Sequence, residues 1–219
     1  MPGTAVALAT SPAAQAGGAG GGAAGNWWEA GGASGVVAAY TAKGAASLAA
    51  SYVNVANPGT FDAAPGVAPT WNVATGWTFD GASRYLTTGI TVTQAYTLAV
   101  AFTGAPSAVQ VILGHFGALY NRLLPNRLSQ GVGYGQTYVL PGLTSGVLVL
   151  AGANGYRNGV SETGAADIGS GTNSPYIGAQ NSAGSPGAYY GGSVQAVAIY
   201  NNVLTAPQVA ALSTAMAAI

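Results

Sequence analysis

Apolar and polar residues alternate along several short stretches of the chain. The clearest example is 96–103, where every second residue is large and apolar or aromatic and the residues between are smaller or polar. The large positions are Tyr96, Leu98, Val100 and Phe102. A period of two predicts a half-buried antiparallel strand. Weaker alternation of the same kind predicts strands within 109–113, 132–140, 147–151 and 193–200.

A tight turn is predicted within 156–160 by the pair Asn158-Gly159. A type I′ turn needs positive φ at both central residues, and Asn-Gly supplies it at low cost. The sequence therefore predicts a hairpin at this point.

The period changes from two to that of a helix at the end of the chain. The apolar residues there recur at spacings of three, four and three: Val209, Leu212, Met216 and Ile219. Such a stripe predicts a short amphipathic helix whose apolar side packs on the rest of the domain.

The residues before this stripe predict where the helix begins. Thr205 and Gln208 have the spacing of a capping box, and Pro207 falls in the first turn, where no backbone donor is required. Leu204 and Val209 are placed to form a hydrophobic staple across the helix start.

The composition favours a single all-β domain. The chain has 219 residues, of which 49% are hydrophobic, and 35 glycines and 11 prolines divide it into short pieces. Many short strands separated by turns are typical of a β sandwich or barrel. There is no cysteine, so stability comes from packing without disulfides.

The first 25 residues differ from the rest of the sequence. They are nearly all small, and they include a glycine-rich run with Gly18, Gly21 and Gly22. Ordering such a segment costs about 1 to 2 kcal/mol per residue in backbone entropy. We therefore predict an extended arm over 1–25 that contacts neighbouring subunits, followed by one domain over 26–219.

Two adjacent tryptophans, Trp27 and Trp28, follow the arm. One interpretation is that one ring caps the core and the other lies over the sheet, because large aromatic residues usually bury in their own domain. The other is that they anchor a contact with a neighbouring subunit, since tryptophan is enriched among interface hot spots.

Several segments, in this order, are similar to the laminin G-like branch of the concanavalin A-like lectin and glucanase folds. They are 76–86 with its Phe79-Asp80-Gly81, the strand at 96–103, the hairpin at 155–160, Tyr176-Ile177-Gly178, and 190–200 leading into the final helix. The resemblance covers about 70–219, and 36–69 looks like the lead-in of phage and environmental members. It implies a jelly roll of two curved antiparallel sheets. Members of this fold bind sugars or calcium, hydrolyse glucans, or serve as adhesive and structural modules.

The chain is poor in charge. Only five Lys or Arg and five Asp or Glu are present, giving a formal net charge of zero. Nucleic-acid binding requires clustered basic residues, and a membrane helix requires about 20 apolar residues in a row, so neither is expected. A soluble domain normally keeps about a quarter or more of its surface charged, so we predict that this one covers its surface with copies of itself.

Side chains suited to catalysis are few. A glycosidase needs two carboxyl groups about 5 to 10 Å apart, whereas the five acids here are scattered: Glu29, Asp62, Asp80, Glu162 and Asp167. The single histidine, His115, is expected to be a strand residue and not a general base. Asp80, before a glycine, is expected to form an Asx turn and not a calcium site. We predict no enzyme, no cofactor and no metal.

Two roles remain. The first is a structural, self-assembling subunit of a virion or extracellular filament, with Trp27, Trp28, Gly18, Gly21 and Gly22 in the contacts. The alternative is a carbohydrate-binding module at the cell exterior or virion surface. Its sugar would stack on tyrosines, for which the candidates are Tyr134, Tyr138, Tyr189 and Tyr190.

Overall fold

The structure is a computed structural model of the chain. It describes residues 26–105, 110–116, 119–124, 127–132, 137–139, 143–162 and 174–219. The predicted arm, with Gly18, Gly21 and Gly22, lies outside the described residues and stays a prediction.

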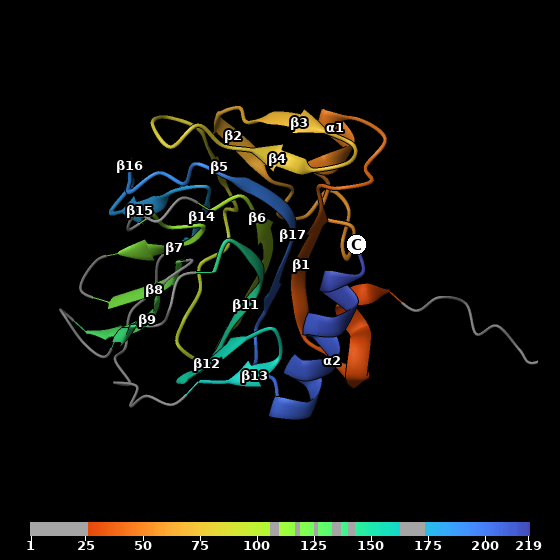
Figure 1. The fold of residues 1–219 in the computed structure, drawn as a ribbon, viewed down its shortest axis with the longest axis vertical. Helices are drawn as coiled ribbons and strands as arrows, with labels where there is room; N and C mark the ends of the chain where they lie inside the picture. The colour runs from red at the N-terminus through yellow and green to blue at the C-terminus, as the bar shows by residue number, and fades with distance from the viewer. Residues whose placement is uncertain are drawn as a thin grey trace, which may run out of the picture.

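Two β-sheets pack face to face (Figure 1). The strands of the first sheet are β1 (Val36–Thr41), β3 (Thr70–Asn72), β4 (Gly76–Thr78), β6 (Thr97–Thr103), β11 (Ser145–Ala151), β12 (Asn154–Arg157), β13 (Val160–Ser161) and β17 (Ser193–Tyr200). Their order is β13-β12-β11-β6-β17-β4-β3, and β1 also pairs with β17.

The second sheet carries the candidate site. Its strands are β2 (Ala64–Val67), β5 (Tyr85–Thr87), β7 (Leu113–Phe116), β8 (Leu119–Leu124), β9 (Arg127–Val132), β10 (Thr137–Val139), β14 (Tyr176–Ile177), β15 (Gln180–Ser182) and β16 (Ser185–Gly187). The order is β10-β9-β8-β7-β14-β5-β2, and β15 pairs with both β7 and β16. Among the described strands, β15 and β7 form the one parallel pair.

Alternation along the strands builds two apolar layers. Leu98, Val100 and Phe102 of β6 point between the sheets into the main core. Ala99 and Ala101, on the opposite face of the same strand, pack beneath the helix α2 (Ala206–Ala217) and the 3₁₀ segment η1 (Trp27–Gly32). A second helix, α1 (Leu48–Ser51), is a single turn. Figure 1 shows α2 and η1 side by side against the first sheet, away from the second.

The fold prediction is confirmed as an all-β sandwich of two sheets with a C-terminal helix. The strand predicted at 193–200 matches β17, and the one at 96–103 begins one residue later as β6. The prediction at 109–113 is displaced, because β7 begins only at Leu113. The prediction at 132–140 falls on the end of β9 and on β10, partly outside the described residues.

The predicted hairpin and helix start are also observed. Asn158 and Gly159 have φ of 50° and 80°, as a type I′ turn requires. Thr205 and Gln208 form the capping box, in which the Thr205 backbone N–H donates to Gln208 Oε1 at 2.9 Å. The staple residues Leu204 and Val209 are both buried.

We expect Thr205→Ala to lower the free energy of unfolding by about 1 kcal/mol, because it removes the side chain that caps the first turn of α2. Urea unfolding followed by circular dichroism measures the change. Thr214→Ala, at an exposed position of the same helix, is the matched control and should change stability less. Equal losses in the two variants would contradict a capping role.

In the part of the chain that the structure describes, we find no helix with the length and apolar character needed to cross a membrane.

Candidate functional site

A row of paired residues runs across the outer face of the second sheet. Thr87 of β5 is paired with Tyr176 of β14, which is paired with Gly114 of β7, and Gly114 is paired with Arg122 of β8. Directly opposed residues in antiparallel strands point to the same face. The neighbours of these residues, such as Leu86 and Ile177, point inward and belong to the main core.

Three tyrosines gather on this outer face. The rings of Tyr85 and Tyr176 are stacked, with centroids 5.0 Å apart and planes at 29°. Tyr189 lies against Tyr85 with a centroid distance of 6.4 Å and planes at 57°. Tyr176 is 9% exposed, whereas Tyr85 and Tyr189 are half-buried. Burial and the neighbouring Tyr85 raise the pKa of the Tyr176 phenol, which donates to the Gly184 carbonyl at 3.3 Å.

A glycine allows Tyr85 to lie across the neighbouring strand. Gly66 stands where the pairing of β2 with β5 is irregular, between Pro65 and Val67. A Cβ at Gly66 would lie 2.0 Å from Tyr85 Cζ, so any side chain there would displace the ring. The absence of a side chain at this position therefore allows the Tyr85 ring to lie where it does.

Polar groups adjoin the tyrosines. Arg122 Nη1 donates to Gln180 Oε1 at 3.1 Å, and Gln180 Nε2 donates to Ser182 Oγ at 2.8 Å. The Arg122 guanidinium also lies over the Phe116 ring, 5.2 Å from its centroid. A Cβ at Gly114 would lie 3.2 Å from Arg122 Cγ, so this glycine lets Arg122 lie across β7.

We call this surface the tyrosine face. Its members are Tyr85, Tyr176, Tyr189, Phe116, Arg122, Gln180 and Ser182. It combines aromatic rings with amide, guanidinium and hydroxyl groups, which is the composition of sites that hold a polar ligand against an apolar platform.

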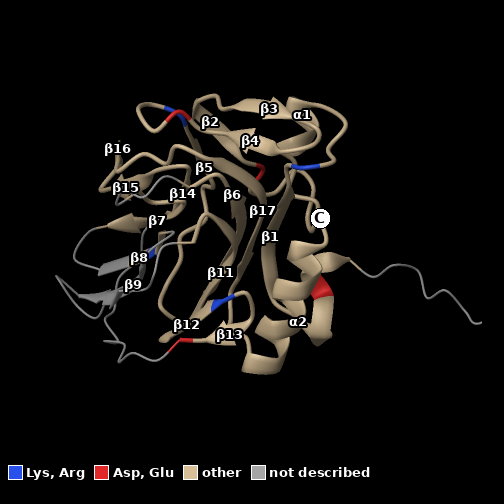
Figure 2. Ribbon diagram, in the orientation of Figure 1, with Lys and Arg blue, Asp and Glu red and all other residues tan. Residues whose placement is uncertain are grey.

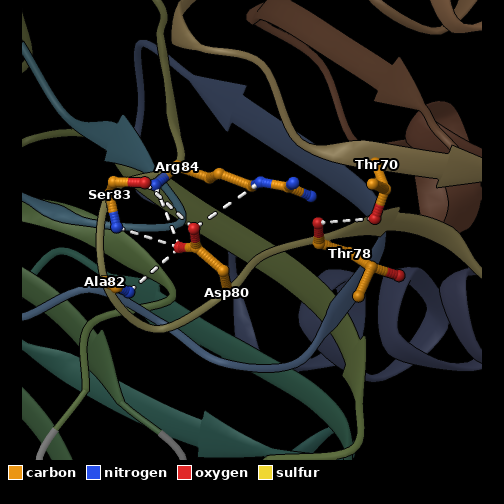
Figure 3. Close-up of polar contacts among 6 residues, drawn as sticks. All are labelled: Thr70, Thr78, Asp80, Ala82, Ser83 and Arg84. Atoms are coloured by element: carbon orange, nitrogen blue, oxygen red, sulfur yellow. Dashed lines mark hydrogen bonds and ion pairs between the residues drawn. The ribbon is translucent and has the colours of Figure 1, made fainter.

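The loop before Tyr85 is held rigidly by Asp80 (Figure 3). Asp80 Oδ1 accepts from the backbone N–H groups of Ala82, Ser83 and Arg84 at 2.9, 2.9 and 3.1 Å. Its other oxygen, Oδ2, accepts from Ser83 Oγ at 2.9 Å and lies 3.6 Å from Arg84 Nε. This is the Asx turn expected from the sequence, and it leads directly into β5.

The same loop also fixes the chain around Tyr189. The Gly81 N–H donates to the Tyr190 carbonyl at 2.9 Å, and Gln110 Oε1 accepts from the Gly191 N–H at 2.8 Å. Ala188, immediately before Tyr189, has a positive φ of 45°. The Asp80 loop therefore helps to position two of the three tyrosines.

The Asp80 carboxyl makes the stability of the folded state depend on pH. Hydrogen bonds from the backbone N–H groups of Ser83 and Ala82 hold the pKa of its carboxyl well below its usual value. In the unfolded chain the pKa of this carboxyl is about 4. Because its pKa is lower in the folded state, the ionised carboxylate stabilises the fold at higher pH, and this contribution is lost as pH falls from the unfolded-state pKa through the folded-state pKa. We expect Asp80→Asn to be less stable at neutral pH and to lose less stability on acidification. Urea unfolding at a series of pH values measures this, and parallel profiles for the two proteins would contradict it.

The tyrosine candidates from the sequence have different fates. Tyr189 lies in the tyrosine face, but Tyr190 is 0% exposed and its hydroxyl donates to the Thr103 carbonyl at 3.0 Å, so it is a core residue and cannot contact a ligand. Tyr138 lies in β10, where the structure does not describe side chains. Tyr134 lies outside the described residues. Tyr85 and Tyr176 were missed, although both belong to segments that carry the family resemblance.

The two tryptophans are half-buried in η1. Trp27 packs against the apolar layer under α2 and donates through Nε1 to Thr41 Oγ1 at 3.0 Å. The Trp28 ring meets Trp27 edge to face at 5.5 Å, and its carbonyl accepts from the Tyr200 hydroxyl at 2.7 Å. Both tryptophans thus make contacts within the domain, on the side opposite the tyrosine face.

Charged residues are spread thinly over the described chain (Figure 2). Its four acids have local partners: Glu29 accepts from Asn26, Asp62 from the backbone of Asn54 and Gly59, Asp80 from its own loop, and Glu162 from Arg157.

His115 lies in β7, 1% exposed, with Nε2 at 3.4 Å from Asn121 Nδ2. Within the described ranges no group of three acidic or histidine side chains is placed to hold a metal ion. Asp167 lies outside them.

Comparison with solved structures finds carbohydrate-active proteins of the same fold. Domain 4 of AbnA, a GH43 extracellular arabinanase from Geobacillus stearothermophilus, in complex with arabinotriose, matches 81% of this chain and 98% of its own, with a TM-score of 0.52 and 15% identity. The Trypanosoma rangeli sialidase in complex with the inhibitor DANA matches 82% of this chain but 33% of its own, with a TM-score of 0.56 and 18% identity. The same sialidase with sialic acid gives a TM-score of 0.54 at 16% identity.

Neither a protein-family model nor a curated protein matches the sequence. At the identities above, the structural similarity establishes the fold alone. The chain is a jelly-roll-like β sandwich of the type found in glycoside hydrolases and sialidases, and it spans about a third of the sialidase chain.

These comparisons correct one prediction. The scattered acids led us to predict that the protein is not an enzyme, but the structures that this chain resembles are glycoside hydrolases and sialidases or domains of them. The prediction was wrong because it gave the spacing of the acids in the sequence more weight than the resemblance to a fold that also includes glucanases. The predicted filament or virion role finds no support in the comparisons, which favour the carbohydrate-binding alternative.

Proposed function

We propose that this domain binds oligosaccharides on the tyrosine face. A sugar ring has an apolar face of C–H groups and a rim of hydroxyls. It can stack on the exposed parts of Tyr85 and Tyr189 while its hydroxyls bond to Gln180 and Ser182. We further propose that the domain is a laminin G-like member of the concanavalin A-like folds and works outside the cell.

The observation that carries the proposal is the arrangement of the three tyrosines. Rings from β5, from β14 and from the segment before β17 meet on one surface, although Tyr85 and Tyr189 are far apart in the sequence. Core tyrosines in this protein, such as Tyr190 and Tyr200, are 0% exposed. Tyr85 and Tyr189 are instead only half-buried, on a face that also carries groups that form hydrogen bonds.

The structural neighbours support this proposal. One of them is a complete domain that was solved with arabinotriose. We therefore suggest arabinotriose as the first probe, within a wider panel of neutral and anionic oligosaccharides.

The proposal is tested by applying the purified protein to a glycan array and then measuring the best binders by isothermal titration calorimetry. We expect saturable binding of at least one oligosaccharide class with a stoichiometry of one ligand per chain. An array without any signal, together with no heat from arabinotriose, would contradict the proposal.

A further inference from the structure

Phe61 has an unusual combination of conformation and exposure. Its φ is 57°, in the left-handed region that bulky residues rarely adopt, and its side chain is 43% exposed. A strained backbone at a large residue persists only where the surroundings enforce it, and such residues cluster at functional sites. The core gains little from this ring, because much of it faces solvent.

The surrounding contacts enforce this conformation. The Tyr40 hydroxyl donates to the Phe61 carbonyl at 2.5 Å, and Tyr40 is itself completely buried. The next residue, Asp62, accepts through Oδ1 from the backbone N–H groups of Asn54 at 2.8 Å and Gly59 at 3.2 Å. The backbone on both sides of the Phe61 carbonyl is thus held in place.

The Phe61 ring lies beside the chain that follows β5, the strand that carries Tyr85. Tyr85 and Thr87 flank the buried Leu86 and share the outer face of β5, and Gly89 lies exposed two residues beyond the end of this strand with a positive φ of 66°. The Phe61 ring lies beside Gly89, with Cδ1 3.9 Å from where a Cβ of Gly89 would be. Between these points, Thr87 is paired with Ala64 and its hydroxyl donates to the Ala64 carbonyl at 3.1 Å.

Tyr85 and Gly89 are four residues apart, so their Cα atoms are separated by at most about 14 Å. Tyr85 thus lies at the start of β5, Thr87 at its end, and the Phe61 ring beside Gly89 beyond that end. We call the path along β5 from Tyr85 to Phe61 the track.

We propose that Phe61 is a second stacking platform and that the ligand is a linear oligosaccharide lying along β5 from the tyrosines to Phe61. This inference rests on the proposed function and adds the ligand's class, a chain of several sugars, and a residue that selects for its length. A single sugar would occupy the tyrosine end only and would not reach Phe61.

The test is binding of the intact protein to an array of arabino-, xylo-, gluco- and galacto-oligosaccharides from one to six units. The same array is applied to Phe61→Ala, Phe61→Tyr and Val73→Ala. Phe61→Tyr keeps an aromatic ring. Val73→Ala shortens a side chain that is 55% exposed, in the turn between β3 and β4. Urea unfolding of each variant verifies that it is folded.

In the wild-type protein we expect affinity to rise with chain length. Phe61→Ala should lower affinity for the longest bound chains about tenfold and leave the shortest bound chains unchanged. Phe61→Tyr and Val73→Ala should keep the wild-type length dependence. Wild-type binding of long chains that Phe61→Ala leaves intact, or equal affinity for monosaccharides and long chains, would overturn the track while leaving the proposed function in place. No binding by the wild-type protein would overturn both.

Discussion

Replacing Trp77 with alanine should destabilise the domain by about 3 to 5 kcal/mol, the range for deleting a large aromatic side chain from a core. Trp77 is 0% exposed, and its Nε1–H donates to Ser51 Oγ at 2.7 Å. Its ring centroid lies 6.3 Å from that of Tyr40 and 6.1 Å from that of Tyr52. Truncation leaves a cavity between β4 and α1 and removes the hydrogen bond to Ser51.

Urea unfolding followed by tryptophan fluorescence and circular dichroism measures this loss. Trp28→Ala is the matched control, because it removes the same side chain from a half-buried position in η1. We expect it to cost clearly less than Trp77→Ala. A similar loss at both positions would contradict the assignment of Trp77 to the centre of the core.

The second large effect concerns ligand binding. Tyr85→Ala should weaken oligosaccharide binding at least tenfold, or about 1.4 kcal/mol, because truncating a central aromatic contact typically costs this much or more. The Tyr85 ring contacts the rings of both Tyr176 and Tyr189. Its loss therefore removes one ring and also the contact that joins the other two. Titration calorimetry with the best ligand from the array measures the change. Trp28→Ala, in η1 on the side of the domain opposite the tyrosine face, should bind normally.

Gly66→Ala refines the same prediction. The added Cβ would lie 2.0 Å from Tyr85 Cζ, and no residue of the tyrosine face is replaced. The end of the Tyr85 side chain is the group that must move. We expect weaker binding with little change in unfolding free energy, since Gly66 is exposed. Full binding by both Tyr85→Ala and Gly66→Ala would show that the ligand does not use this ring.

The sequence predicted those parts of the fold that depend on local signals. β17 and α2 follow from short-range periodicity, and the turn at Asn158 from the conformational preference of two residues. The position of β7 was not predicted, because the apolar residues Val111 and Ile112 before it are buried without belonging to a strand. Burial by tertiary contacts produces the same apolar run as a strand does.

The candidate site was harder to predict because it is assembled from distant segments. Strand pairing of β5 with β14 brings Tyr85 and Tyr176 together, and no spacing in the sequence reveals that pairing. Alternation did contain one usable signal. Adjacent residues in extended chain point to opposite faces, so Tyr189 and Tyr190 could not both contact a ligand on one face. The structure buries Tyr190 and leaves Tyr189 accessible.

The most direct test of the account is to map the bound sugar on the protein by NMR, following backbone amide signals of the wild-type domain during titration with its best oligosaccharide. The account predicts that the largest shifts fall in β2, β5 and β14 and at Tyr189 and its neighbours, with η1 and α2 unchanged. Shifts centred on η1 and α2, or saturating binding with no shift around Tyr85, would contradict it.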